Sequence, residues 1–325
     1  MTLSSIPLVS IVVCTYNGSE YIREQLNSLL IQSFPIYEII VQDDCSSDDT
    51  WSILESYRER YPTLFKIYRN DNNLFWNQNF YSAILKCSGD YIALCDQDDI
   101  WEPNKIEIQV KELLESSNLI HICGQWLWED ENITPLSYKA SSILHSFFYP
   151  PFCGHTMMFS SSIKKHIASG QRIDMAHDMF IGLIGSYLES ITYSDSLLVK
   201  WRRHPKSSTG HFSPVVASSG MKKVFYSLGH LNPRKRSSMV FQAVTKYYEE
   251  LCYLAKEFGI RENTVELIHF FNNLRQQSVL SYIKATVFLC GNDDIIIGNR
   301  FSGIKKIYNK ITYLFRWWYD HQNEL

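Results

Sequence analysis

The sequence predicts an α/β protein with a mainly parallel central sheet flanked by helices. Up to about residue 130, short runs rich in β-branched and aromatic residues alternate with stretches of helical periodicity. Repeated βα units of this kind favour parallel strands joined by right-handed crossovers. Hydrophobic residues make up 45% of the chain and charged residues 20%, so there is ample material for a core. Acidic residues directly follow two of the apolar runs, where a sheet of this class exposes its ligand-binding edge.

Each expected strand is a short apolar run, and the runs cover residues 9–16, 37–42, 64–70, 90–95 and 119–128. The helices expected between them each carry one apolar stripe. The stripe residues are Ile22, Leu26, Leu29 and Leu30, then Trp51, Leu54, Tyr57 and Tyr61, then Phe80, Ile84 and Cys87, and last Ile106, Val110, Leu113 and Leu114.

The regular alternation stops near residue 131. Residues 131–153 are interpreted as an insertion or a long loop, and residues 154–160 and 196–204 as later strands around a helix at 178–188. Ser, Gly, Pro and Lys are concentrated at 205–223, which is typical of a linker. We therefore expect two regions, a domain at 1–212 and a helical C-terminal region at 213–325.

Charge differs between these two regions. Residues 1–212 hold 16 Lys and Arg against 25 Asp and Glu, whereas residues 213–325 hold 15 against 9. Such asymmetry indicates different partners for the two regions, and we expect no nucleic acid among them. Eight cysteines occur without a C-x-x-C pair, which argues against a zinc or redox motif. With no signal peptide and no run of 18 apolar residues, a cytoplasmic protein is expected.

Carboxylates at two strand exits are the most informative feature. Asp43 and Asp44 follow one apolar run, and Asp96, Asp98 and Asp99 follow another. Converging carboxylates repel one another unless they share a cation, and Mg²⁺ and Mn²⁺ prefer oxygen ligands. One Asp pair alone would favour the alternative, a solvated turn. Two groups at successive strand exits favour a site.

The first expected strand ends in Thr15-Tyr16-Asn17-Gly18, not in a glycine-rich dinucleotide or P-loop motif. Thr15, Tyr16 and Asp44 could instead hold a base and a ribose. A diphosphate would then need a metal, which the second acidic group could bind.

Six segments in order resemble the family 2 glycosyltransferases of the GT-A fold, most closely the bacterial rhamnosyltransferase-like subgroup. They are VSIVVCTYNGSEYIREQLNSLLIQSF, IIVQDDCSSDDT, GDYIALCDQDDIWEPNKI, GHTMMF, HDMF and WRRHPKSSTG, and they span about residues 7–211. The resemblance implies inverting transfer of a sugar from a UDP-, dTDP- or GDP-linked donor. It also implies a saccharide or lipid-linked acceptor, in bacterial surface polysaccharide synthesis.

The resemblance also assigns roles to single residues. It implies a catalytic base at Asp178 and a divalent Mn²⁺ or Mg²⁺ bound by the D-x-D residues Asp96 and Asp98 with His204. Donor contacts are implied at Thr15, Tyr16, Asn17, Asp44, Asp96, Arg202 and Arg203. Further candidates are Asp99, Lys105 and His177.

Some alternatives remain open at the level of single residues. On spacing alone, Asp178 reads as a helix N-cap as well as a base. Cys45 and Phe75 stand where similar proteins usually have glycine, which bears on donor preference. A catalytically silent nucleotide-sugar-binding protein is the alternative function, and the retained Asp178 and D-x-D favour the enzyme.

Two aromatic-rich segments have two interpretations each. The cluster Trp126, Trp128, Phe147, Phe148 and Tyr149 could stack on an acceptor or pack in the core. A helix at 300–319 carries lysines among Ile and Trp residues, which suits either peripheral binding to the inner face of the cytoplasmic membrane or packing with snorkelling lysines.

Overall fold

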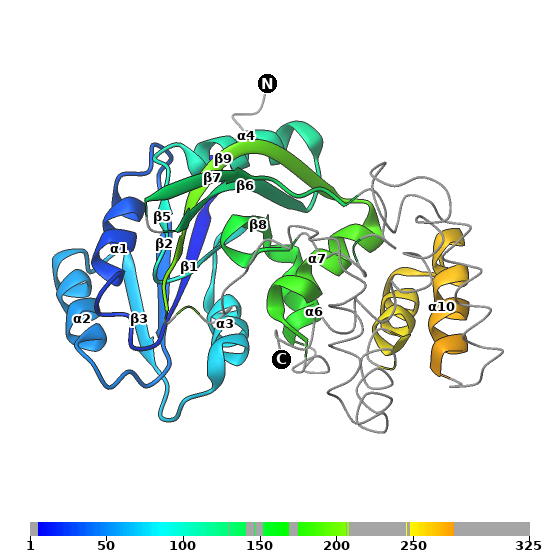
Figure 1. Ribbon diagram of the computed structural model, residues 1–325, viewed down its shortest axis with the longest axis horizontal. Coiled ribbons are helices and arrows are strands. Elements are labelled where there is room, and N and C mark those ends of the chain that lie inside the picture. The colour runs from blue at the N-terminus through cyan, green and yellow to red at the C-terminus, as the bar shows by residue number, and fades with distance from the viewer. Residues whose placement is uncertain are drawn as a thin grey trace, which may run out of the picture. The chain divides into compact units, whose positions relative to one another are not determined.

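The computed structural model describes residues 6–129, 131–140, 152–168, 175–205 and 248–275, together with the single residues Ser146, Ser207 and Thr245 (Figure 1). The chain divides into two compact units. The first consists of Met1–Lys139 with Pro151–His204, and the second of Ala140–Pro150 with Pro205–Leu325. Our expected boundary at residue 212 lies outside the described residues and stays a prediction.

A nine-stranded, mostly parallel sheet forms the centre of the first unit and confirms the predicted α/β fold (Figure 1). The strand order is β3-β2-β1-β4-β8-β6-β9-β5, and β7 pairs with β6 off this path. Strands β1 to β4, β6 and β9 run in one direction, while β5, β7 and β8 are antiparallel to their neighbours. The strands are β1 Val9–Thr15, β2 Glu38–Asp43, β3 Phe65–Arg69, β4 Tyr91–Cys95, β5 Ile100–Trp101, β6 Ile120–Glu129, β7 Asn132–Leu136, β8 Met157–Ser160 and β9 Ile191–Arg203.

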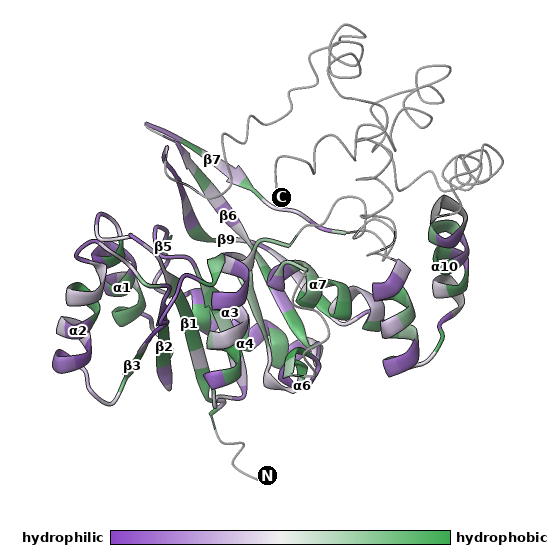
Figure 2. Cartoon of the chain, turned by 90° about the horizontal axis from the view of Figure 1, so that it is seen from below, coloured by the Kyte–Doolittle hydropathy of each residue, from purple (hydrophilic) through white to green (hydrophobic). Residues whose placement is uncertain are grey.

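Helices flank this sheet and contribute their apolar faces to the core. Helix α3 contacts β1 and β2, while α4 contacts β6 and β9. Figure 2 shows hydrophobic residues along β1 and hydrophilic ones on the outer face of α2. The helices of this unit are α1 Ile22–Leu30, α2 Thr50–Arg60, α3 Phe75–Lys86, α4 Lys105–Ser116, α6 Lys164–Ala168 and α7 His177–Leu188, with short 3-10 turns η1 Gly154–Thr156 and η2 Ser161–Ile163.

The predicted helical stripes are buried or partly buried against the core, with one exception. Leu26, Leu54 and Ile106 are each fully buried against the sheet. Leu114 is 55% exposed, so including it in its stripe was wrong. It follows the buried Leu113 by one residue and therefore lies at the edge of the apolar face.

Two short strands were not predicted. Residues 131–153 are not simply a loop, because β7 forms a hairpin with β6 in which Pro135 pairs with Trp126. Four of the five β7 residues are exposed, so no apolar alternation marks them, and proline is tolerated on such an edge strand. Strand β5 is only two residues long, too short for a periodic signal.

The described part of the second unit is helical. Residues 248–258 form one helix and α10 spans Glu262–Arg275. The first of these helices has an apolar face, on which Leu251, Leu254 and Ala255 are buried. The helix predicted at 300–319 lies outside the described residues. Among the helices that are described, none combines the length and apolar character needed to cross a membrane.

Candidate functional site

Three strand ends meet at one edge of the sheet. Strand β1 pairs in parallel with β2 on one side and β4 on the other, with Thr15 opposite Asp43 and Val13 opposite Cys95. The residues that follow these strands therefore leave the sheet side by side. This topology brings the two predicted acidic groups to the same edge, as expected for an open α/β sheet.

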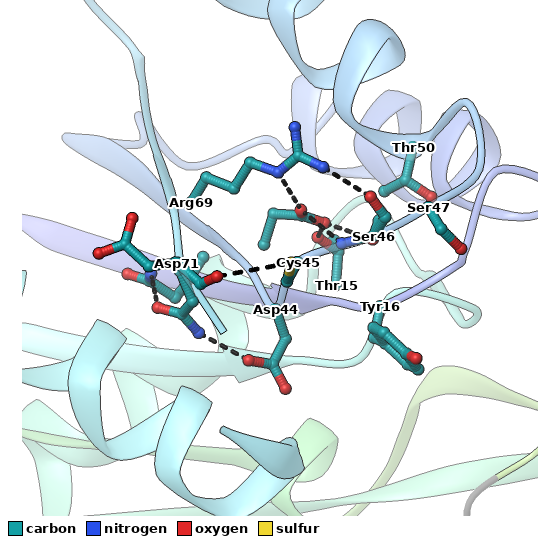
Figure 3. Close-up of polar contacts among 12 residues, drawn as sticks. Thr15, Tyr16, Asp44, Cys45, Ser46, Ser47, Thr50, Arg69 and Asp71 are labelled. Carbon is teal, nitrogen blue, oxygen red and sulfur yellow. Dashed lines mark hydrogen bonds and ion pairs between the residues drawn. The ribbon is translucent and has the colours of Figure 1, made fainter. Parts of the chain in front are cut away.

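Asp43 is a structural residue of this edge. Its buried carboxylate accepts hydrogen bonds from Thr15 Oγ1 at 2.8 Å and from the Ser46 backbone N–H at 3.0 Å. Arg69 Nε lies 3.5 Å from the same carboxylate. Arg69 Nη2 donates to the Ser46 carbonyl at 2.6 Å (Figure 3). The Thr15 hydroxyl, predicted to contact a nucleotide, is thus used to hold Asp43.

Asp44 lies beside an exposed aromatic ring. Its Oδ1 accepts from Asn70 Nδ2 and from the Leu74 backbone N–H, each at 2.7 Å. Tyr16 is 48% exposed nearby (Figure 3). The Asn17 side chain is engaged by the protein, because its Oδ1 accepts from the Ser47 N–H at 2.8 Å. Of the predicted nucleoside contacts, Tyr16 and Asp44 are therefore placed best for a ligand.

The two positions that depart from glycine adopt a glycine-like backbone. Cys45 and Phe75 both have a φ of 64°, in the left-handed region. Side chains with a Cβ are disfavoured there. The local backbone that glycine would supply is therefore present, at a conformational cost.

A second acidic group surrounds a buried histidine. His155 Nδ1 lies 3.1 Å from Asp96 Oδ2 and 3.6 Å from Asp99 Oδ2. One ligand atom from each of these three residues lies within 4.8 Å of the other two. His155 Nε2 bonds to the side-chain oxygen of Gln125, which leaves Nδ1 facing the carboxylates.

A cation bound at this cluster would offset the repulsion between its carboxylates. Asp99 is fully buried, and its Oδ2 has no hydrogen-bond partner among the described residues. Burial and the nearby Asp98 and Asp96 charges raise the pKa of Asp99 well above its usual range, although His155 opposes this. Burial lowers the pKa of His155, but Asp99 and Asp96 outweigh it and raise that pKa overall.

Asp98 and His204 form a separate pair. His204 Nε2 lies 2.8 Å from Asp98 Oδ2, and the His204 ring packs against Tyr21. Burial and repulsion from Asp96 raise the pKa of Asp98. The three-residue cluster thus contains Asp96 of the predicted metal ligands, together with Asp99 and His155. His155 was not assigned a role from the sequence; its place in the GHTMMF segment was the available signal.

Arg202 is held by protein groups, although a donor contact was predicted for it. Its backbone N–H donates to Asp99 Oδ1 at 3.1 Å and its Nε to the Asp98 carbonyl at 3.0 Å. The guanidinium also pairs with Glu24 and lies over the rings of Tyr21 and Trp128. Arg202 thereby fixes the acidic turn, and Trp128 packs on it. Phe147, Phe148 and Tyr149 of the predicted aromatic cluster lie outside the described residues.

Arg203 is the neighbouring basic candidate. Its guanidinium lies 4.6 Å from the centre of the Trp201 ring. Burial lowers its pKa, while Glu129, Asp98 and Asp99 act in the opposite direction. Arg203 is therefore within electrostatic reach of the acidic turn.

Lys105 is buried and contacts Trp101 and Gln109, and among the described residues it makes no hydrogen bond to the acidic cluster. Its side chain is fully buried, with Nζ 3.8 Å from the Trp101 ring centre and donating to Gln109 Oε1 at 2.7 Å. Burial lowers the pKa of Lys105 to about 8. Gln109 in turn donates to the Thr156 carbonyl at 3.0 Å, next to His155. Lys105 thus supports the segment that carries His155.

Asp178 lies in the first turn of α7. The residue before that helix is Ala176, which makes no side-chain cap, and Asp178 Oδ1 accepts from the Met179 N–H at 2.7 Å. A Cβ added to Gly154 would lie 3.7 Å from the Asp178 Cβ. The segment carrying His155 therefore runs directly beside Asp178.

His177 anchors this helix start. Its ring is buried and stacks on Phe80 at 4.1 Å, and its backbone N–H donates to Asn77 Oδ1 at 2.7 Å. Burial lowers the pKa of His177 despite the opposing Asp178 and Asp96 charges. The packed His177 thus fixes the start of the helix that carries Asp178.

Comparison with known proteins identifies the family. The model of glycosyl transferase family 2 matches residues 10–172, half of the 325-residue chain. The chain belongs to this family. Asp44, Asp96, Asp98 and Asp99 lie inside the matched segment, whereas Asp178 lies beyond its end.

Individual relatives extend this result. A putative teichuronic acid biosynthesis glycosyltransferase, TuaG of Bacillus subtilis, is 34% identical over 133 residues, 40% of this chain and 51% of that protein. An uncharacterized glycosyltransferase of Rickettsia prowazekii is 29% identical over 219 residues, 62% of this chain and 66% of its own. The chain thus spans about half to two thirds of the length of these relatives.

Solved structures support the GT-A fold. S. aureus TarS 1-349 in complex with UDP-GlcNAc has a TM-score of 0.56 at 18% identity, covering 95% of this chain and 91% of that one. Mannosyltransferase PcManGT from Pyrobaculum calidifontis, in complex with GDP-Man and Mn²⁺, has a TM-score of 0.51 at 13% identity, covering 98% and 87%. At these identities the likeness concerns the fold.

Proposed function

We propose that this chain is a metal-dependent, inverting glycosyltransferase that moves a sugar from a nucleotide-sugar to a saccharide or lipid-linked saccharide. The observation that carries the proposal is the neighbourhood of Asp178 and the Asp96, Asp99 and His155 cluster, joined through Gly154. A candidate base thus lies beside a candidate cation site. The nucleoside would bind at the same sheet edge, at Tyr16 and Asp44.

The acidic cluster fits a divalent cation. It offers two carboxylates and one imidazole, and the buried Asp99 Oδ2 lacks a hydrogen-bond partner among the described residues. Mn²⁺ and Mg²⁺ favour oxygen ligands, and Mn²⁺ also accepts imidazole. Bound there, such an ion would supply charge stabilisation for the leaving diphosphate. Asp98 and His204 remain further proposed ligands.

The protein's own groups account for the remaining chemistry. An acceptor hydroxyl is a weak nucleophile until its proton is removed as attack develops, and the Asp178 carboxylate is placed to take that proton. Attack opposite the leaving group inverts the anomeric centre. Arg203 would add positive charge near the departing diphosphate, and Arg202 would hold the acidic turn in place.

Substrate class is proposed from the relatives. TarS binds UDP-GlcNAc and PcManGT binds GDP-Man with Mn²⁺ in their solved complexes. TuaG is named for teichuronic acid biosynthesis. We therefore propose a UDP-, dTDP- or GDP-linked donor, a role in bacterial surface polysaccharide synthesis, and membership of the rhamnosyltransferase-like subgroup.

A screen of nucleotide-sugar hydrolysis with Mn²⁺, Mg²⁺ or EDTA tests this function. We expect metal-dependent release of UDP, dTDP or GDP from at least one donor. Asp178→Asn keeps the size of the side chain but cannot accept a proton, so sugar transfer should fall about 10²–10⁴-fold. Nucleotide affinity, measured by calorimetry, should change little.

Two results would contradict the proposal. Full activity in excess EDTA would exclude the metal. Tight nucleotide-sugar binding without turnover of any donor or acceptor would favour the alternative, a catalytically silent nucleotide-sugar-binding protein.

A further inference from the structure

An exposed apolar run begins helix α3. Leu74, Phe75 and Trp76 are 40%, 74% and 48% exposed, and Phe75 is the most exposed large hydrophobic side chain among the described residues. Contiguous exposed apolar residues often mark a binding surface. Leu85, also on α3, is similarly exposed at 42% but stands alone, which makes it a useful control.

The backbone of this run is strained. Phe75 has a φ of 64°, which glycine adopts freely and a bulky residue does not. Its N–H donates to Asn73 Oδ1 at 2.8 Å, and the preceding N–H donates to Asp44, so two consecutive N–H groups hold this conformation. A strained backbone that holds a large exposed ring suggests that the ring has a function.

Residues 74–76 lie between the proposed nucleoside site at Asp44 and the proposed base Asp178. At one end, the Leu74 N–H donates to Asp44 Oδ1, on the nucleoside side. At the other end, the Trp76 ring packs edge-on against His177 with ring centres 5.7 Å apart. His177 directly precedes Asp178.

Helices α3 and α7 are tied together at this point. Asn77 accepts from the His177 N–H and donates to the Met175 carbonyl, each at 2.7 Å. Tyr81 OH donates to the same carbonyl at 3.0 Å. The Trp76 ring therefore has a fixed position relative to the start of α7.

An acceptor must bring one hydroxyl to the Asp178 carboxylate. The sugar ring that bears this hydroxyl then lies within a few ångströms of the helix start, where Trp76 is the exposed aromatic ring that contacts His177. Pyranose rings present a face of C–H groups, which packs on aromatic rings by dispersion and apolar burial. The donor nucleoside has its own place at Tyr16 and Asp44.

We propose that Phe75 and Trp76 form an aromatic platform for the pyranose ring of the acceptor saccharide. This inference rests on the proposed function, because it takes Asp178 as the base. It adds a binding surface for the acceptor, and it assigns a use to the strained, exposed Phe75.

Saturation-transfer NMR on the full chain tests the platform. The probes are the methyl pyranosides of glucose, N-acetylglucosamine, mannose and rhamnose, with saturation of the protein's aromatic protons. We expect transfer to the C–H protons of at least one probe. Phe75→Gly and Trp76→Ala should each weaken that binding about threefold to tenfold. Trp76→Phe should retain most of it, and Leu85→Ala all of it.

Phe75→Gly separates binding from folding. Glycine suits the left-handed backbone, so this variant should unfold at the same or a higher temperature while it loses probe binding. Equal binding by wild type, Phe75→Gly and Trp76→Ala would overturn the platform, as would absence of binding to all four probes. Donor hydrolysis by the wild-type chain is measured in parallel. If donor is hydrolysed but the Phe75 and Trp76 variants bind the probes as well as wild type, the platform is wrong and the proposed function is kept.

Discussion

At the scale of single residues, Gln97 joins the D-x-D turn to the loop after β1, which carries Tyr16. Its Oε1 accepts from the Tyr16 N–H at 2.9 Å, and its Nε2 donates to the Tyr16 carbonyl at 3.1 Å. The middle residue of the D-x-D is therefore bonded at both ends of its amide to the loop after β1. Gly18 makes room for it, since a Cβ there would lie 2.2 Å from Gln97 Oε1.

We predict that Gly18→Ala displaces the Gln97 amide and weakens nucleotide binding. Loss of two hydrogen bonds that position the loop should reduce affinity for the donor nucleotide about tenfold. Calorimetric titration with UDP, dTDP and GDP measures this. Gln97→Ala should have a similar effect, and the double variant should be no worse than either single one. Additive losses would show that Gly18 acts independently of Gln97.

The sequence predicted where the acidic residues lie in the fold better than it predicted their contacts. Asp44 and Asp96 follow strands whose apolar runs are easily read, so their common edge could be foreseen. The GHTMMF segment that carries His155 was part of the family resemblance, but nothing in it indicated that the ring lies 3.1 Å from Asp96 across antiparallel strands. Arg202 was assigned by motif, while its contacts with Glu24 and Trp128 depend on tertiary packing.

At the scale of secondary structure, Glu38 joins several elements at the start of β2. Its fully buried carboxylate accepts from Ser10 Oγ of β1 at 2.7 Å and from Lys66 Nζ of β3 at 2.6 Å. It also accepts from the Ser88 N–H before β4 at 2.6 Å. Burial alone would raise the pKa of Glu38, but Lys66, Ser10 and Ser88 outweigh it and lower that pKa.

A lowered folded-state pKa fixes the sign of the pH dependence. Glu38 contributes stability above its unfolded pKa, ordinarily 4.5, and this contribution is lost as pH falls through the folded-state pKa. Glu38→Gln should lower the free energy of unfolding at pH 7 by about 1–3 kcal/mol. The difference in free energy of unfolding between wild type and Glu38→Gln should become smaller below pH 4.5, the ordinary pKa of a glutamate. Urea unfolding at several pH values measures this. Glu55→Gln, at a surface carboxylate whose side chain is 41% exposed, is a control that should show little difference from wild type at any pH.

Regular elements were predicted where periodicity is strong. Strands β1, β2 and β4 and helices α1 to α4 have clear apolar runs or stripes, and the structure has them at these places. Strand β7 is mostly exposed, so the pairing with β6 rather than a hydrophobic pattern defines it. The first half of β9, with residues Thr192 to Ser196, is polar and only partly buried, which is why the strand begins earlier than predicted.

At the scale of the whole molecule, the order of strands in the sheet follows from tertiary pairing more than from local sequence. Strand β8 inserts antiparallel between β4 and β6. This insertion carries η1, and with it His155, to the edge where β4 delivers Asp96. The mainly parallel sheet was predictable from the βα repeats, whereas the insertion that completes the cluster was not.

The C-terminal region motivates the last prediction, which is a hypothesis from the sequence alone. Residues 213–325 carry 15 Lys and Arg against 9 Asp and Glu, and 300–319 combine basic residues with Ile and Trp. A lipid-linked acceptor would be presented at a membrane surface. We therefore predict peripheral binding of the full chain to anionic liposomes, weakened by salt because the basic residues contribute part of the attraction.

Each lysine near an anionic surface is worth about 1 kcal/mol, so replacing Lys305 and Lys306 with glutamine should weaken liposome binding about thirtyfold. Replacing Lys111 and Lys139, two surface lysines of the first unit with side chains 71% and 50% exposed, should change it little. Sedimentation with anionic and neutral vesicles distinguishes the two pairs. Residual binding in high salt would reflect the apolar contribution of the Trp and Ile side chains. Equal sedimentation of both variants and wild type would instead assign this helix to packing within the protein or to oligomerisation.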